Sequence, residues 1–93
     1  MDTIEQFNQY VMPSYGRYPL VMDSGEGEYA SAEDGKRYID FGSGIGTNSL
    51  GYCDEDWVKA VCEQAHRLQH TSNYNNTMVQ ADFAKALCET AGE

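Results

Sequence analysis

Hydrophobic residues near the start of the chain recur at helical spacing. Ile4, Phe7 and Val11 stand at positions i, i+3 and i+7, so they fall on one face of a helix. Pro13 lacks a backbone N–H group and cannot continue a helix. The pattern therefore predicts a short amphipathic helix over residues 2–12.

Two further amphipathic helices are predicted in the second half of the chain. The first begins near Asp54, whose carboxylate can accept N–H groups at a helix start, and the polar run 73–76 interrupts it. The second begins at Thr77, which with Gln80 matches a capping box, and it runs to Gly92. Their apolar stripes consist of Val58, Val61, Cys62, Ala65 and Leu68, and of Val79, Phe83, Ala86 and Leu87.

The middle of the chain has the pattern of short antiparallel strands. Two Tyr-containing runs, at about 27–31 and 37–41, flank a polar connector with Gly35, and a glycine there favours a hairpin because it tolerates positive φ. Residues 19–23 are a candidate third strand. Residues 42–51 hold four of the nine glycines and are predicted to be irregular. The predicted fold class is α+β: a helix, a small antiparallel β-hairpin or three-stranded sheet, then two helices.

The composition is that of a folded, acidic chain. The 93 residues carry 15 acidic and 6 basic side chains, a net charge of -9, and 41% are hydrophobic. A mass of 10.4 kDa suffices for one small domain with a buried core, but not for two. Nucleic acid is not an expected partner, because phosphate binding requires clustered Lys and Arg.

Targeting and redox signals point to the cytoplasm. No apolar run approaches the roughly 18 residues that span a bilayer, and the acidic N-terminus lacks the basic and apolar regions of a signal peptide. The three cysteines are widely spaced and form no CxxC motif, which fits reduced thiols. We therefore expect a cytoplasmic protein without a membrane partner.

The glycine-rich loop 42–51 is the first candidate for chemistry, because closely spaced glycines let backbone N–H groups approach a phosphate. Its sequence, GSGIGTNSLG, matches neither GxGxxG nor GxxxxGK[ST]. No Lys or Arg lies between Arg37 and Lys59 to neutralise a phosphate. A tight loop with close backbone packing is the favoured interpretation, and a phosphate-binding loop is the alternative.

Histidine and cysteine pairs are weaker candidates. His66 and His70 have the i, i+4 spacing of a metal-binding pair, but the Glu of HExxH and a third ligand are missing, so we interpret them as polar helix-terminal residues. Three flanking acids disfavour a reactive thiolate at Cys53, and Cys62 lies on an apolar stripe. The residues by themselves predict neither a catalytic set nor a metal site.

Six short motifs follow one another along the chain. They are Tyr15-Gly16-Arg17-Tyr18-Pro19, Gly25-Glu26-Gly27, Asp34-Gly35-Lys36-Arg37-Tyr38-Ile39-Asp40-Phe41, Gly44-Ile45, Asn48-Ser49-Leu50-Gly51, and Ser72-Asn73 with Thr77 and Gln80. In this order they resemble the N-terminal region of class III pyridoxal-phosphate aminotransferases, most closely the acetylornithine type. The chain departs from the family after Gly51, where members usually read SLGHxHP and this chain has Tyr52, and at Asn75, where a second Tyr is common.

The resemblance implies that residues 1–93 are the N-terminal segment of a fold-type I, pyridoxal-phosphate-dependent transferase, without its cofactor-binding large domain. It implies a cytoplasmic homodimer that transfers an amino group between N-acetylornithine and 2-oxoglutarate in arginine biosynthesis, with pyridoxal 5'-phosphate as the electron sink. The Schiff-base lysine and the phosphate-binding segment of the family have no match here. We therefore expect the isolated segment to be inactive and not to bind the cofactor.

The resemblance also implies two substrate-binding residues. Tyr15 matches a tyrosine that reaches the carboxylate end of the substrate. Ile45 matches a position beside the substrate's chain that is Tyr in the ornithine type and Ile in the acetylornithine and 4-aminobutyrate types. Alternatives are that Ile45 is a core residue, that the segment belongs to an ornithine or 4-aminobutyrate aminotransferase, or that it is a stand-alone oligomerisation or binding module.

Overall fold

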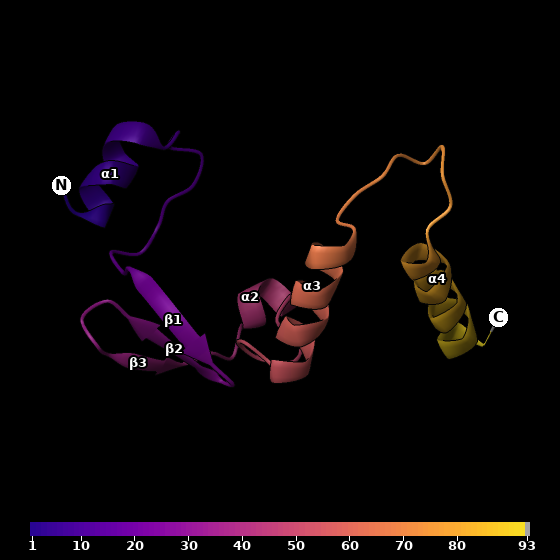
Figure 1. The fold of residues 1–93 in the computed structure, drawn as a ribbon. Helices are drawn as coiled ribbons and strands as arrows, with labels where there is room; N and C mark the ends of the chain where they lie inside the picture. The colour runs from indigo at the N-terminus through magenta and orange to yellow at the C-terminus, as the bar shows by residue number, and fades with distance from the viewer. Residues whose placement is uncertain (93) are drawn as a thin grey trace. The chain divides into compact units, whose positions relative to one another are not determined.

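The computed structural model describes residues 1–92, and its element order confirms the α+β class (Figure 1). The elements are α1 (Thr3–Tyr10), β1 (Met22–Glu26), β2 (Tyr29–Ala32), β3 (Arg37–Ile39), α2 (Ser43–Gly46), α3 (Glu55–Arg67) and α4 (Met78–Ala91). The chain divides into two units, Met1–Lys59 and a second unit from Ala60 onward. The first unit contains the sheet, and α4 lies in the second.

Helix α1 begins with a reciprocal cap that the hydrophobic pattern did not reveal. The Asp2 carboxylate accepts the Glu5 N–H at 2.8 Å, and the Glu5 carboxylate accepts the Asp2 N–H at 3.0 Å. This capping box fixes the start of the helix. At the other end Val11 is already extended, so α1 ends at Tyr10, two residues earlier than predicted.

The predicted hairpin is confirmed, and a third strand completes an antiparallel sheet in the order β1-β2-β3. The third strand is β1, which starts at Met22 rather than at residue 19. Pro19 has no N–H group for a ladder, which explains why pairing begins only after it. Ala30 and Ala32 on the central strand are the buried hydrophobic residues of the described chain, at 5% and 6% exposure.

The loop predicted to be irregular contains one turn of left-handed helix, α2. Ser43, Gly44, Ile45 and Gly46 have φ angles of 52°, 60°, 60° and 77°. Left-handed backbone costs an L-residue roughly 1–2 kcal/mol, and a β-branched residue such as isoleucine is rarely found there. The prediction that the whole loop is irregular is therefore wrong for Ser43–Gly46, because glycine content alone does not reveal a regular left-handed turn.

The starts of α3 and α4 are near the predicted positions, but their caps differ. Asp54 precedes α3 and its carboxylate accepts the Trp57 N–H at 3.0 Å, as predicted. Thr77 is the N-cap residue of α4, yet its side chain makes no capping hydrogen bond, so the predicted capping box is wrong. Gly92 ends α4 with a φ of 80°, which confirms the predicted glycine stop.

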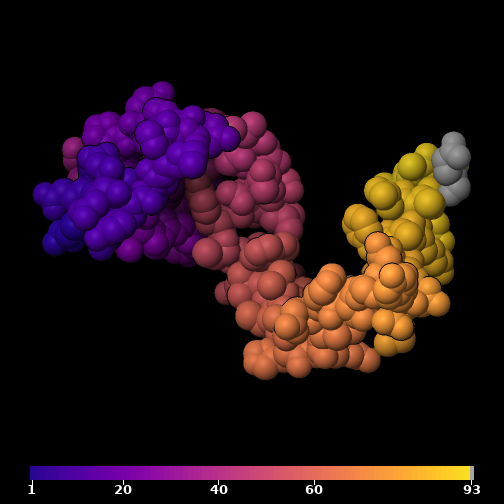
Figure 2. Space-filling view, turned by 90° about the horizontal axis from the view of Figure 1, so that it is seen from above, coloured from indigo at the N-terminus to yellow at the C-terminus, as the bar shows by residue number. Residues whose placement is uncertain are grey.

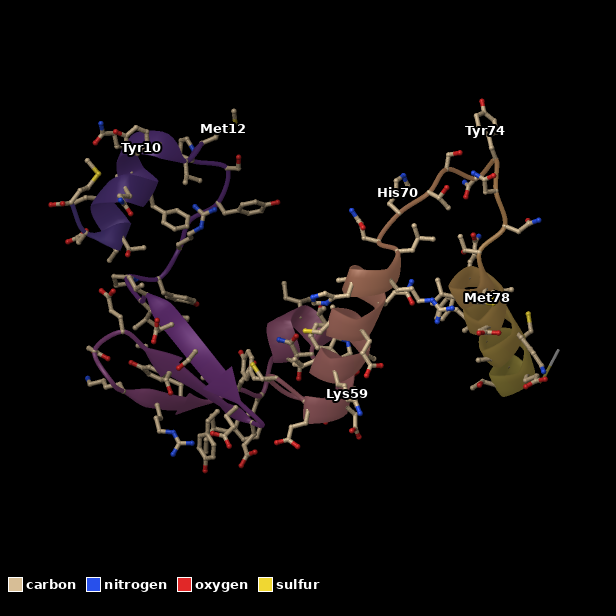
Figure 3. All side chains as sticks on the ribbon, viewed as in Figure 1. Tyr10, Met12, Lys59, His70, Tyr74 and Met78 are labelled. Atoms are coloured by element: carbon tan, nitrogen blue, oxygen red, sulfur yellow. The ribbon has the colours of Figure 1, made fainter. Side chains whose placement is uncertain are left out.

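The described residues do not form the single buried core that the chain length allows. None of the four helices contains a buried residue, and their apolar stripes are exposed along their length. In the space-filling view, the side chains of residues 1–20 (indigo) lie at the surface of the first unit (Figure 2). Figure 3 labels exposed hydrophobic side chains of both units: Tyr10 and Met12 in the first, and Tyr74 and Met78 in the second. Over residues 1–92 no helix has the length and apolar character that crossing a membrane requires.

Candidate functional site

Asp40 organises the glycine-rich loop that follows β3. One carboxylate oxygen, Oδ1, accepts the N–H groups of Gly42 at 2.8 Å and Ser43 at 2.9 Å. The other, Oδ2, accepts the hydroxyl proton of Tyr52 at 2.5 Å. The Asp40 N–H itself donates to the Glu28 carbonyl at 2.8 Å, which ties the residue to the sheet.

These hydrogen bonds shift both titrations in the pair. The Tyr52 hydroxyl lowers the pKa of Asp40 below its ordinary value, and the Ser43 and Gly42 amides lower it further. The hydrogen bond to the Asp40 carboxylate is the main cause that raises the pKa of Tyr52. Partial burial of the phenol raises it further, and the negative charge of Asp40 makes the smallest contribution. The pair is therefore formed by a charged carboxylate and a neutral phenol at neutral pH.

Tyr52 is itself held against the sheet by backbone contacts. Its N–H donates to the Gly27 carbonyl at 2.8 Å, and its carbonyl accepts the Gly27 N–H at 3.0 Å. The tyrosine ring lies over Gly25, so closely that a Cβ at Gly25 would stand 2.5 Å from the ring carbon Cγ. A Cβ at Gly51 would stand 2.8 Å from the Gly27 carbonyl oxygen. Both positions therefore require glycine.

Ile45, one of the two predicted substrate-binding residues, lies on the α2 turn and is fully exposed. Nearby Phe41 is 93% exposed. Ile45 is thus not part of a core formed by the described residues. The turn that carries it is closed by two local hydrogen bonds, from the Gly46 N–H to the Gly42 carbonyl and from the Asn48 N–H to the Ser43 carbonyl.

Tyr15, the other predicted residue, lines a groove between α1 and the segment that runs from Val11 to Met22. The Arg17 guanidinium lies 5.0 Å from the Phe7 ring centre and 6.0 Å from the Tyr15 ring centre. Arg17 also donates to the Tyr15 carbonyl at 3.5 Å. It is the one Lys or Arg residue among residues 1–35, so the groove combines a phenol hydroxyl with the local positive charge.

The structure does not bring Tyr15 and Ile45 together. The segment with Tyr15 leads from α1 into β1, whereas α2 follows β3 and lies apart from α1 in Figure 1. Within the first unit the elements that pack together are the strands of the sheet. The two residues therefore belong to separate surfaces of this unit.

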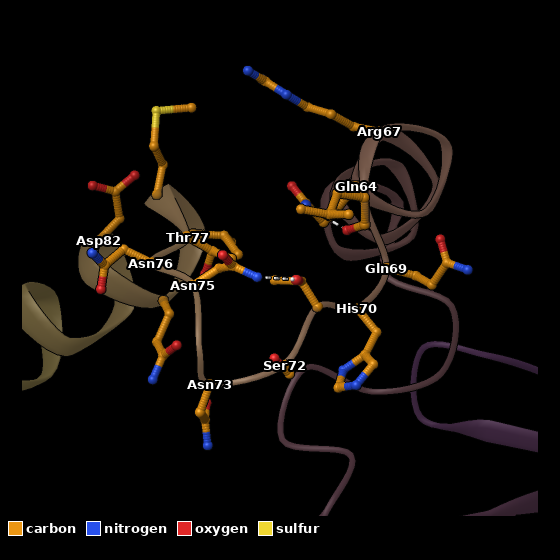
Figure 4. A pocket seen from close by; sticks show the side chains of 15 residues that line it. Gln64, Arg67, Gln69, His70, Ser72, Asn73, Asn75, Asn76, Thr77 and Asp82 are labelled. Carbon is orange, nitrogen blue, oxygen red and sulfur yellow. Dashed lines mark hydrogen bonds between the residues drawn. The ribbon is translucent and has the colours of Figure 1, made fainter.

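A polar cavity lies in the second unit, between the end of α3, the following loop and the start of α4 (Figure 4). Asn75 donates to the Thr71 hydroxyl at 3.2 Å across it.

The two histidines do not share a helix. Helix α3 ends before His70, so only His66 is helical, and its Nδ1 lies 2.8 Å from the Cys62 carbonyl. Among residues 1–92 no group of three or more His, Cys, Asp or Glu side chains could hold a metal ion.

The described residues do not fit pyridoxal phosphate by themselves. The three lysines, Lys36, Lys59 and Lys85, are all exposed, so none projects into an enclosed site. In the glycine-rich loop the N–H groups of Gly42 and Ser43 already donate to Asp40 and are not free for a phosphate. No step of chemistry on the cofactor is therefore assigned to this chain.

The sequence matches the family model described as aminotransferase class-III over residues 10–93. The chain belongs to the class-III aminotransferase family. It is 42% identical over 92 residues to the acetylornithine aminotransferase of Haemophilus ducreyi, and 44% identical over 89 residues to that of Methanosarcina acetivorans. These matches cover 98% and 96% of the chain, but only 23% and 22% of the two relatives.

Solved ornithine and acetylornithine aminotransferases confirm the fold. The ornithine aminotransferase of Toxoplasma gondii superposes with a TM-score of 0.90 at 29% identity, and the acetylornithine aminotransferase of Elizabethkingia anophelis with a TM-score of 0.91 at 28% identity. Each match covers 96% of the chain, and 21% and 23% of the respective structures. The chain thus has the fold of the N-terminal region of a pyridoxal-phosphate aminotransferase and spans less than a quarter of the length of these relatives.

Proposed function

We propose that this class-III chain is the N-terminal segment of an acetylornithine-type aminotransferase. The complete enzyme would be a cytoplasmic homodimer that uses pyridoxal phosphate to move the δ-amino group of N-acetylornithine to 2-oxoglutarate, a step of arginine biosynthesis. The observation that carries this proposal is the identity of 42–44%, sustained along nearly the whole chain, to two acetylornithine aminotransferases. Residues 1–93 would contribute binding surfaces, and the cofactor would be held by the remainder of the enzyme.

The exposure of Ile45 supports its assignment to the substrate side. A fully exposed isoleucine on a strained left-handed turn makes no packing contribution to this segment. Backbone strain of this kind persists where the surrounding structure fixes it and is concentrated at functional sites. An apolar side chain there offers no hydroxyl to a free α-amino group and leaves space for an N-acyl group.

The groove at Tyr15 has the chemistry to bind a carboxylate. A phenol O–H can donate one hydrogen bond to a carboxylate oxygen, and a guanidinium can add charge-assisted hydrogen bonds. Arg17 lies beside Tyr15 and is not neutralised by a described carboxylate within hydrogen-bonding distance. Both amino-acid and 2-oxoacid substrates carry such a group.

The test uses a chimeric enzyme in which this chain replaces the matching residues of the Haemophilus ducreyi acetylornithine aminotransferase. Its kcat/KM is measured with N-acetylornithine and with ornithine, each with 2-oxoglutarate. We expect N-acetylornithine to be preferred. Ile45→Tyr should shift the ratio of the two kcat/KM values towards ornithine by about 1–3 kcal/mol, since one pocket side chain typically discriminates by that amount.

Leu50→Tyr is the matched control, because Leu50 belongs to the same loop and is also exposed but lies outside the left-handed turn. It should leave the ratio unchanged. If Ile45→Tyr also leaves the ratio unchanged, Ile45 does not lie beside the substrate. If the unmodified chimera prefers ornithine, the acetylornithine assignment is wrong.

An ornithine-type enzyme is the second candidate. The observation in its favour is the superposition on the Toxoplasma gondii ornithine aminotransferase, with a TM-score of 0.90 and 29% identity. The lower identity and the isoleucine at position 45 favour the acetylornithine type. A second chimera, with this chain in place of the matching residues of the Toxoplasma gondii ornithine aminotransferase, separates the two: an acetylornithine-type segment should lower kcat/KM for ornithine in that enzyme, and an ornithine-type segment should leave it unchanged.

A further inference from the structure

The start of the left-handed turn α2 is held by one carboxylate, that of Asp40. Its two closing hydrogen bonds, from Gly46 to Gly42 and from Asn48 to Ser43, are local to the loop. No helix or strand of the first unit packs on the turn. The link to the sheet is Asp40, whose Oδ1 holds the N–H groups of the first two loop residues.

Tyr52 fixes the orientation of that carboxylate from the far end of the loop. Its hydroxyl donates to Asp40 Oδ2 at 2.5 Å, across twelve residues of sequence. Its backbone is paired with Gly27, and its ring lies over Gly25. Both ends of the loop are therefore held to the turn between β1 and β2, and the α2 turn projects between them.

From this geometry we infer that Tyr52, acting through Asp40, positions the α2 turn and thereby sets the direction in which Ile45 meets the substrate. Tyr52 is a positioning residue: it determines specificity without contacting the substrate. This inference rests on the proposed substrate-side role of Ile45. It goes further because it makes the discrimination between acyl-substituted and free amino donors depend on the hydrogen bond from Tyr52 to Asp40, which joins the two ends of the loop that carries Ile45.

The physical reason is that the turn is strained and has few other restraints. Ser43 and Ile45 both adopt a φ angle that L-residues disfavour, so the turn relaxes unless the surrounding contacts hold it. Without the phenol hydroxyl, the Asp40 carboxylate can rotate away from the two amides it accepts. The α2 backbone then gains access to ordinary φ values, and Ile45 loses its fixed direction.

The experiment uses the chimeric holoenzyme and the variant Tyr52→Phe, which removes one oxygen atom and keeps the ring over Gly25. We expect the ratio of kcat/KM for N-acetylornithine to that for ornithine to change by about threefold to tenfold, as is usual for directly coupled residues. Hydrogen exchange of a peptide spanning residues 41–50 should become faster. Tyr38→Phe is the control, because Tyr38 is an exposed tyrosine on β3 outside the loop, and it should change neither reading.

A double-variant cycle tests whether Tyr52 acts through Ile45. If it does, Tyr52→Phe should no longer change the substrate ratio in an Ile45→Ala background. An undiminished effect in that background overturns the inference. Gly25→Ala supplies a second route, because its Cβ displaces the Tyr52 ring while both members of the hydrogen bond are retained, and it should shift the ratio in the same direction.

Failure of this inference is distinguishable from failure of the proposed function. If the unmodified chimera transaminates N-acetylornithine but Tyr52→Phe leaves both the ratio and the exchange unchanged, the positioning role is wrong and the proposed function stands. If the chimera has no activity with N-acetylornithine, the proposed function is wrong. Unchanged exchange of the 41–50 peptide would overturn the positioning role in that case as well.

Discussion

A side chain can be excluded at a glycine position for two reasons, a positive φ angle or a close contact of the added Cβ, and Gly16, Gly25, Gly27 and Gly51 differ in which of these apply. At Gly51 both reasons apply, because its φ is 80° and a Cβ would lie 2.8 Å from a backbone oxygen. Gly27 has a φ of 56° with open space around it, Gly25 has a close contact without a positive φ, and Gly16 has neither. Alanine substitution at these positions should therefore give graded effects on the bridge between Gly27 and Tyr52.

The magnitudes follow from the backbone. For Gly27→Ala, the left-handed conformation costs roughly 1–2 kcal/mol, and the reduced entropy of the unfolded chain returns about 0.4–1, which leaves a net loss of about 1 kcal/mol. Gly51→Ala adds a clash with backbone atoms that cannot move aside, so both hydrogen bonds of the bridge are lost. Each contributes about 0.5–1.5 kcal/mol, so the total loss is about 2–4 kcal/mol.

The assay is amide hydrogen exchange of the 93-residue chain, read by NMR at the Gly27 and Tyr52 N–H groups. Protection of these two amides reports the free energy of opening of the bridge. Gly16→Ala should leave protection unchanged, Gly27→Ala should reduce it slightly, and Gly51→Ala should reduce it most. Equal losses for Gly27→Ala and Gly51→Ala would refute the reasoning, because the backbone contact would then add nothing to the φ preference.

Three further predictions concern charges, caps and the groove. The pKa of Asp40 is lowered from 3.8, so the carboxylate stabilises the loop fully above pH 3.8, and this stabilisation is lost as the pH falls through the lowered pKa. The pKa of Tyr52 is raised from 10.0, so the phenol stabilises the loop fully below pH 10.0, and this stabilisation is lost as the pH rises through the raised pKa. NMR shifts of the loop amides should change at both limits, and Tyr52→Phe should remove the alkaline change. Asp2→Ala should destabilise α1 by about 1 kcal/mol while Thr77→Ala leaves α4 unchanged, as followed by Cα chemical shifts, since only Asp2 has a capping hydrogen bond. In the chimera, Tyr15→Phe should raise KM for the amino donor about tenfold or more through the loss of one charge-assisted hydrogen bond, and an unchanged KM would remove Tyr15 from the substrate site.

Local patterns predicted the elements whose causes are local. The hairpin follows from alternating residues around Gly35, the start of α3 from the Asp54 carboxylate, and the end of α4 from Gly92. The motif order correctly placed the chain in its family. Each of these features depends on a few neighbouring residues, which is why single-sequence reasoning could find them.

Contacts across longer stretches were not predictable in the same way. The pair of Asp40 and Tyr52 joins residues twelve positions apart, and no spacing rule indicates that a carboxylate after one strand will meet a later tyrosine. The missed signal was the motif itself: Tyr52 stands where the family usually has histidine, and that departure marked a residue with a structural partner. The Thr77 capping box failed for the opposite reason, because a matching pair of residue types does not ensure the side-chain rotamer.

The left-handed turn of α2 makes the stability of this loop depend on the chirality of its residues. Its backbone has the mirror image of ordinary helical angles, which is the conformation that a D-amino acid prefers and an L-amino acid resists. Gly46 has open space where an L-side chain would project, and its φ is 77°. A D-alanine introduced there by chemical synthesis would favour the turn by its handedness, whereas the ribosome can only approximate this preference with glycine.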